Sequence, residues 1–128
     1  MLKKVKIQDL PALSYNLPEG IEVSRVFEGK NYMIAYWRGA PPAPLKDEPH
    51  KHEGYGIVEE TILLFKGKMR ITAGDDSVEF GAGEAVSYLG SETHQSEILE
   101  PVEALMIVGP PVKVRTTEKE VEYLKKEV

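Results

Sequence analysis

Histidines are the side chains through which this chain could do chemistry, since the sequence contains three of them and no cysteine. His50 and His52 stand two positions apart, so in an extended segment both imidazoles point to the same side of the backbone. His94 follows much later in the chain. Neutral imidazole is the commonest metal-binding side chain in proteins. We therefore expect His50, His52 and His94 to converge on one divalent metal ion.

A carboxylate is expected to complete this ligand set. Glu53, Glu59 and Glu60 follow the histidine pair, and Glu60 lies in an apolar stretch that runs toward Gly67. Strand alternation does not choose between Glu59 and Glu60, because both faces of this stretch are apolar. Imidazole and carboxylate ligands suit divalent Fe, Mn, Zn, Ni or Cu. Such a ligand set would leave a coordination position open, as is typical of catalytic rather than structural sites.

Each of these features also has an ordinary explanation. A pair of histidines around one residue is more often surface decoration than a binding site. A glutamate at the start of an apolar strand usually lies at a solvated edge, and a single late histidine usually has no special role. The metal hypothesis therefore rests on the combination, because every histidine of the chain takes part in it.

The elements that must position these side chains are predicted to be short strands. Apolar and polar residues alternate within them, and turn residues separate them. The strands expected from this pattern are 21–27, 32–38, 50–53, 57–65, 69–73, 77–80, 85–88, 94–98 and 103–108, with a short edge strand near residues 5–7. Gly67 and Lys68 are expected to form a turn, and Pro101 to divide the last two strands. Short strands with closely spaced turns indicate an all-β sandwich or barrel.

The end of the chain has a different pattern. Residues 117–120 fit a helix capping box, with threonine first and glutamate last. Apolar residues then recur at helical spacing, at Val121, Leu124 and Val128. We predict a C-terminal α-helix over about residues 117–127 that lies on the barrel or on a partner subunit.

Length and charge narrow the class of protein. The 128 residues fit one domain over 1–128, with a core barrel at about 20–112. A formal net charge of -5 gives no basic surface of the kind that nucleic-acid binding requires. No apolar run is long enough to cross a bilayer, and we see no signal peptide, so we expect a cytoplasmic protein without a membrane partner. The absence of cysteine excludes disulfides and thiolate ligands, so any metal must be held by nitrogen and oxygen.

The histidine pattern resembles the first motif of the cupin superfamily. That motif places two histidines around one residue, then a glutamate, then six residues and a glycine. His50 and His52 match the pair, and Glu60 and Gly67 have the family's interval. The resemblance therefore favours Glu60 over Glu59 as the carboxylate ligand. The spacing from His52 to Glu60 is longer than is usual in the family, and a turn at residues 54–56 would absorb the excess.

The second cupin motif is matched in part. In the family it ends in a histidine that follows a Gly-Asp/Glu turn and a Pro-x-Gly loop. Residues 83–84 match the turn, and His94 stands at the histidine position. Leu89 and Ser91 replace the proline and the second glycine of the loop. The resemblance covers about residues 40–108 and implies a jelly-roll barrel, or double-stranded β-helix.

The resemblance also implies a function. It makes the chain a divalent-metal-binding cupin, with the metal held by His50, His52, Glu60 and His94. We expect a metalloenzyme of the dioxygenase, isomerase or lyase type that acts on a small oxygen-bearing organic substrate. A non-catalytic module that binds a small ligand or the metal, and a barrel without metal, are the alternatives. The sequence does not identify a general base, and the nearest candidates are Glu53, Glu59 and Tyr55.

Assembly is expected to follow from the edges of the barrel. Edge strands of a small barrel need to be covered, and the predicted N-terminal strand or C-terminal helix could cover them in a partner. A homodimer is the commonest closed arrangement. The expected partners are therefore a small-molecule ligand or substrate and a second copy of the chain.

Overall fold

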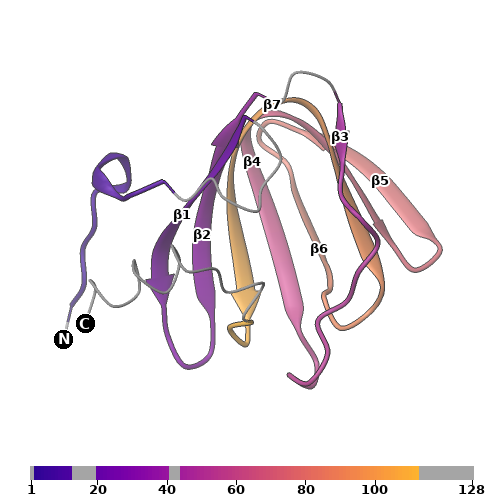
Figure 1. The fold of residues 1–128 in the computed structure, drawn as a ribbon, viewed down its shortest axis with the longest axis horizontal. Helices are drawn as coiled ribbons and strands as arrows, with labels where there is room; N and C mark the ends of the chain where they lie inside the picture. Colours follow the sequence, from indigo (N-terminus) through magenta and orange to yellow (C-terminus); the bar gives the residue numbers. More distant parts are fainter. Residues whose placement is uncertain (1, 13–19, 41–43, 113–128) are drawn as a thin grey trace.

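The computed structural model describes residues 2–12, 20–40 and 44–112, and almost all of its regular structure is β-strand (Figure 1). The elements are the short 3-10 helix η1 (Ile7–Asp9) and the strands β1 (Ile21–Glu28), β2 (Met33–Gly39), β3 (Leu45–Lys46), β4 (Glu59–Ala73), β5 (Asp76–Gly81), β6 (Ala85–Leu89) and β7 (His94–Gly109). The C-terminal helix predicted at about 117–127 lies outside the described residues. Within the described part of the chain, no helix has the length and apolar character to span a membrane.

Two long antiparallel strands, β4 and β7, organise the fold. They pair along their whole length, from Glu59 opposite Gly109 to Ala73 opposite His94. All seven strands are hydrogen-bonded into one continuous sheet that bends into two layers. The first half of β4 lies in the layer β1-β2-β7-β4-β6 and its second half in the layer β3-β7-β4-β5, and we call these layers the two sheets. In Figure 1, β1 and β5 spread to opposite sides while β4 and β7 run between them. The two long strands thus connect the two sheets.

The bend between the two sheets lies at Gly67 and Pro101, where the sequence predicted a turn and a strand break. Both residues lie inside continuous strands, so these two predictions were wrong. Gly67 has a φ of 91°, and a Cβ atom there would overlap the carbonyl oxygen of Pro101. Only glycine tolerates both conditions. The pairing of β4 with β7 shifts register beside Gly67, and these bulges bend the strands without ending them.

The core lies between the two sheets. The register shifts change which residues of β4 face inward, from Ile62 and Leu64 before the bend to Met69 and Ile71 after it. These side chains pack in one buried cluster with residues from both sheets, including Ile21, Phe80, Ile98, Val102 and Ala104. A second cluster, formed by Val58, Val108 and Val112, closes one end. Burial of this apolar surface is the main force that holds the sheets together.

Most of the remaining strand predictions are confirmed, and two are corrected. Strands β1, β2, β5 and β6 match the predicted ranges closely. Residues 5–7 do not form an edge strand, because Ile7 begins η1 and Val5 remains 37% exposed without a pairing partner among the described strands. Residues 50–53 do not form a regular strand either. Only His50 makes a β-bridge, since Pro49 has no N–H to donate to a ladder.

Candidate metal centre

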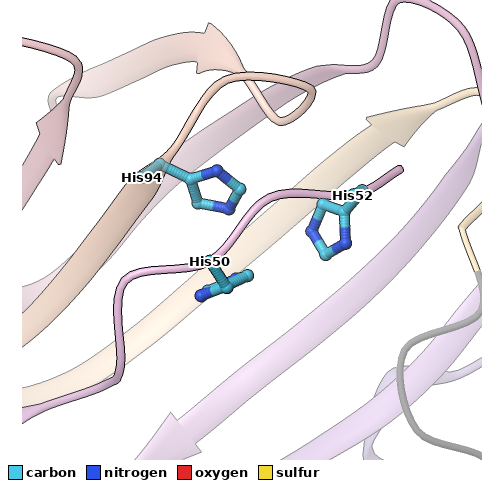
Figure 2. Close-up of side chains that lie close together, drawn as sticks. All are labelled: His50, His52 and His94. Carbon is cyan, nitrogen blue, oxygen red and sulfur yellow. The ribbon is translucent and has the colours of Figure 1, made fainter.

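The three histidines lie side by side although they come from distant parts of the chain (Figure 2). His94 begins β7, whereas His50 and His52 lie between β3 and β4. The His50 amide donates to the His94 carbonyl at 2.9 Å, and the His94 amide donates to the His50 carbonyl at 2.8 Å. The His52 amide donates to the Gly90 carbonyl at 2.8 Å. These bonds hold the segment beside the start of β7, so both of its imidazoles lie next to His94.

The spacing of the rings fits a shared ion. The ring centroids of His50 and His94 are 4.3 Å apart, and each lies 5.3 Å from that of His52. One ring nitrogen from each histidine lies within 4.8 Å of the other two. Three nitrogens bound to one ion lie about 3.0–3.6 Å from one another, because each metal–nitrogen bond is about 2.1 Å long. Metal binding would therefore draw the three ring nitrogens closer together.

Backbone carbonyls fix the orientation of two of the rings. The Nδ1 atom of His50 lies 2.8 Å from the carbonyl oxygen of Glu48, and that of His94 lies 2.8 Å from the carbonyl oxygen of Glu92. A carbonyl oxygen only accepts hydrogen bonds, so Nδ1 carries the hydrogen in both rings. The Nε2 lone pairs are then available to a metal. Metal-binding histidines commonly donate their other ring N–H in this way.

Glu60 is the carboxylate that the fold brings to the histidines. Its side chain is buried, with Oε1 3.0 Å from Nε2 of His52 and Oε2 3.3 Å from Nε2 of His94. Glu59 and Glu53, the two rival carboxylates, are exposed. The difference arises because Glu60 has the inward parity of Ile62 and Leu64 in β4, while Glu59 points to the outer face. A buried carboxylate needs a donor or a cation to offset its lost hydration, and an ion between Glu60 and the Nε2 lone pairs would provide that charge.

Burial determines the protonation state of His52. It lowers the pKa of His52, and the nearby imidazoles of His94 and His50 lower it further. The negative charge of Glu60 acts in the opposite direction but does not reverse the shift. His52 is therefore a neutral imidazole near pH 7, which is the form that binds metals. His50 has the most exposed side chain of the three, at 40%, so it marks the open side of the site.

Tyr88 is a neighbour of the site that the sequence analysis did not identify. It lies opposite Glu60 in the pairing of β4 with β6, and its ring centroid is 5.0 Å from that of His94. Burial, followed by the charge of Glu60 and a hydrogen bond to it, raises the pKa of Tyr88. The phenol therefore keeps its proton and donates to the carboxylate. From the sequence, Tyr88 is one of several aromatic residues expected in the core or at the mouth of the pocket, and only the register of the sheet places it opposite Glu60.

The backbone of Gly90 packs closely against Glu60 and Val58 at the site. A Cβ atom at this position would lie 3.0 Å from Cδ of Glu60 and 3.1 Å from Cγ1 of Val58. The Gly90 amide donates to the Val58 carbonyl at 2.8 Å, and its carbonyl accepts from the His52 amide. The loop 89–93 thus packs directly against the carboxylate and supports one of the histidines.

The candidate general bases from the sequence lie in different surroundings. Glu53 and Glu59 are exposed, and Lys51 forms an ion pair with Glu53 at 3.2 Å. Tyr55 is partly buried and packs against the second core cluster. Glu53 and Glu59 therefore point to solvent, and the structure does not favour either of them as a catalytic base.

Comparison with solved structures identifies the fold that brings the three histidines and Glu60 together. KdgF from Halomonas sp. superposes with a TM-score of 0.72 at 14% identity, covering 87% of this chain and 96% of that one. The polyketide cyclase RemF from Streptomyces resistomycificus gives 0.62 at 20% identity, covering 98% and 94%. The Cupin_2 domain of an XRE family transcriptional regulator from Enterobacter cloacae gives 0.56 at 16% identity, covering 73% and 99%.

Sequence comparison adds no closer relative. No protein-family model and no curated protein matches the chain. The structural likeness is nevertheless extensive, since it covers 87% and 98% of this chain in the first two of these comparisons. The protein therefore has the cupin fold.

Proposed function

We propose that this chain binds one divalent transition metal ion through His50, His52, His94 and Glu60. The observation that carries the proposal is that Glu60, buried in β4, contacts Nε2 of both His52 and His94, while His50 closes the triangle of rings. Three imidazoles and a carboxylate are borderline ligands that suit Fe, Mn, Zn or Ni. The described residues around this point provide the donor atoms and the fixed ring orientations that such an ion needs.

We further propose that the loaded site is a small metalloenzyme. The bound ion would act as a Lewis acid toward an oxygen of a small organic substrate, as in dioxygenase, isomerase or lyase chemistry. The chain's own residues provide the setting: Tyr88 holds the Glu60 carboxylate, and buried β-strands surround it. The more exposed His50 side leaves room for a substrate to approach. A polyketide cyclase among the structures with this fold supports the view that the barrel can carry catalysis.

Metal content tests the binding proposal. The protein would be stripped with a chelator, reconstituted anaerobically with Fe, Mn, Ni or Zn, desalted and analysed for metal. We expect about one equivalent of at least one of these metals, and a large loss in the His94→Ala variant with the fold retained. Glu59→Gln is the matched control, because Glu59 is the exposed neighbour of Glu60. Less than about a tenth of an equivalent bound by a folded protein would refute the proposal.

A non-catalytic binding module is the second candidate. It is favoured by the likeness to a domain of a transcriptional regulator, a class of protein in which a cupin domain need not turn over a ligand. Turnover assays on the metal-loaded protein, with small hydroxy and keto acids as probes, separate the two. Turnover that is lost in His50→Ala supports the enzyme, whereas a probe that binds without turnover supports the module.

The homodimer and the cytoplasmic location remain predictions, to be tested by light scattering and by cell fractionation.

A further inference from the structure

The segment that carries His50 runs beside β7 with an irregular register. Lys46 of β3 pairs with Glu97, and the next paired position is His50 opposite His94. Residues 47–49 therefore lie opposite only residues 95 and 96 of β7. Between these two paired positions, the segment has one residue more than β7. Pro49 lacks an N–H and cannot donate to a ladder at this point. Something other than regular pairing must hold the chain here.

Asp47 provides the missing contacts. Its Oδ1 accepts a hydrogen bond from the Ser96 amide, and its Oδ2 accepts one from the Ser96 hydroxyl, each at 2.8 Å. Its backbone amide donates to the Ser96 carbonyl at 3.0 Å, and its carbonyl accepts from Nε2 of Gln95 at 2.7 Å. One residue thus fixes the segment to β7 through both its backbone and its side chain. The point of attachment, Ser96, lies two residues from His94.

The attachment lies next to the His50 imidazole. Oδ2 of Asp47 is 4.0 Å from Nδ1 of His50, and the carbonyl oxygen of the intervening Glu48 accepts the Nδ1 hydrogen. Apart from these contacts, His50 is held to β7 by the two backbone hydrogen bonds of its β-bridge to His94, and its imidazole is the most exposed of the three. His52, in contrast, is held by Gly90 and Glu60. Loss of the Asp47 contacts should therefore displace His50 more than the other ligands.

We infer that Asp47 is a positioning residue for the metal centre, which acts by holding His50 within reach of His52 and His94. The inference rests on the proposed metal binding, but its physical content is the placement of His50. Partners outside the ligand set typically change metal affinity by about 10- to 100-fold when they are removed. We expect Asp47→Ala to weaken metal binding in that range. Ser96→Ala, which removes the hydroxyl and keeps the amide donor, should weaken it several-fold.

Competition titrations with Co(II) or Zn(II) test the inference. The variants are Asp47→Ala, His50→Ala and the double variant, with thermal unfolding as the check on the fold. If Asp47 acts through His50, the double variant binds no more weakly than His50→Ala alone. The visible spectrum of the Co(II) form should also change in the same way in the two single variants. Asp9→Ala is the charge-matched control, since Asp9 is exposed in η1, on the opposite side of Figure 1 from β3.

Amide hydrogen exchange gives a readout that needs no metal. The His94 amide donates to the His50 carbonyl, so its exchange should accelerate in metal-free Asp47→Ala and Ser96→Ala, while the Leu64 amide, which donates to Glu84, keeps its rate. If wild-type protein binds no metal but His94 exchange accelerates, the metal proposal fails and the placement of His50 by Asp47 stands. Unchanged His94 exchange would overturn the inference. So would Asp47→Ala affinity within twofold of wild type, or an equal loss in the His50→Ala background. If Asp47→Ala does not fold, Ser96→Ala decides by the same criteria.

Discussion

Glu60 and Tyr88 face each other directly across the antiparallel pairing of β4 and β6. This relationship places a phenol beside a buried carboxylate that also contacts His52 and His94. The carboxylate therefore has partners on both sides: two imidazoles toward the site and a phenol from the neighbouring strand. Changes to any of these partners should be measurable in both metal affinity and stability.

Replacement of Glu60 tests the carboxylate. Glu60→Gln keeps the shape of the side chain but removes its charge, so we expect metal affinity to fall by at least about tenfold. Glu59→Gln should leave affinity unchanged, because its side chain is exposed on the opposite face of β4. Isothermal titration with the reconstituting metal measures both. Equal affinities of the two variants would remove Glu60 from the ligand set.

Replacement of Tyr88 tests its hydrogen bond to Glu60. Tyr88→Phe removes one of the partners of this buried carboxylate, so the free energy of unfolding of the metal-free protein should fall by about 1.5–3 kcal/mol. Tyr32→Phe is the control, since Tyr32 is 46% exposed. Urea denaturation at neutral pH gives both values. A Tyr88→Phe protein as stable as the control variant would show that the hydroxyl does not support Glu60.

The close packing of Gly90 predicts a cost for any side chain there. In Gly90→Ala, the added methyl group would press on Glu60 and Val58, and overpacking of this kind usually costs about 1–3 kcal/mol. Metal affinity should fall as well, because Glu60 is displaced. Gly29→Ala is the matched control, since the nearest atom to a Cβ atom there lies at 3.6 Å. Thermal unfolding and metal titration of both variants decide, and a Gly90→Ala protein that equals the control on both counts would contradict the packing argument.

The lowered pKa of His52 predicts a pH dependence of the metal-free protein. The folded state holds this imidazole neutral, while the unfolded chain binds a proton near pH 6.5. Because the unfolded state takes up the extra proton, this group lowers the free energy of unfolding as the pH falls below about 6.5. Its contribution to the slope fades within about one pH unit above that value.

Urea denaturation between pH 7.5 and 5.5 measures this slope. His52→Gln should lose less stability than wild type over this interval, because its side chain takes up no proton. Lys51→Gln, a change at an exposed neighbour, should keep the wild-type slope. A His52→Gln slope equal to that of wild type would show that His52 is not held neutral by the fold.

Much of the fold could be predicted from the sequence because it depends on local alternation. The ranges of β1, β2, β5 and β6 follow from strand periodicity and turn residues. Gly67 and Pro101 were misinterpreted because each residue usually ends a strand. Here they lie together at the bend between two sheets, and that relationship depends on the pairing of β4 with β7, which no local pattern contains.

The candidate site also combines features that local sequence patterns predicted with features that depend on strand pairing. The spacing of His50 and His52 indicates their shared direction even though the segment is not a regular strand. Strand alternation could not choose between Glu60 and Glu59, since both faces of that strand are apolar, whereas the interval to Gly67 favoured Glu60, which is the one the structure buries. Asp47 and Tyr88 could not be found from the sequence, because their contacts with Ser96 and Glu60 follow from the register of strands far apart in the chain.

The most direct test of the account is a crystal structure of the reconstituted protein with anomalous scattering measured at the metal edge. We predict one anomalous peak within about 2.0–2.3 Å of ring nitrogens of His50, His52 and His94, with a Glu60 oxygen in the same shell. An ion bound elsewhere on the molecule, or a fully reconstituted crystal in which these four side chains surround no peak, would contradict it.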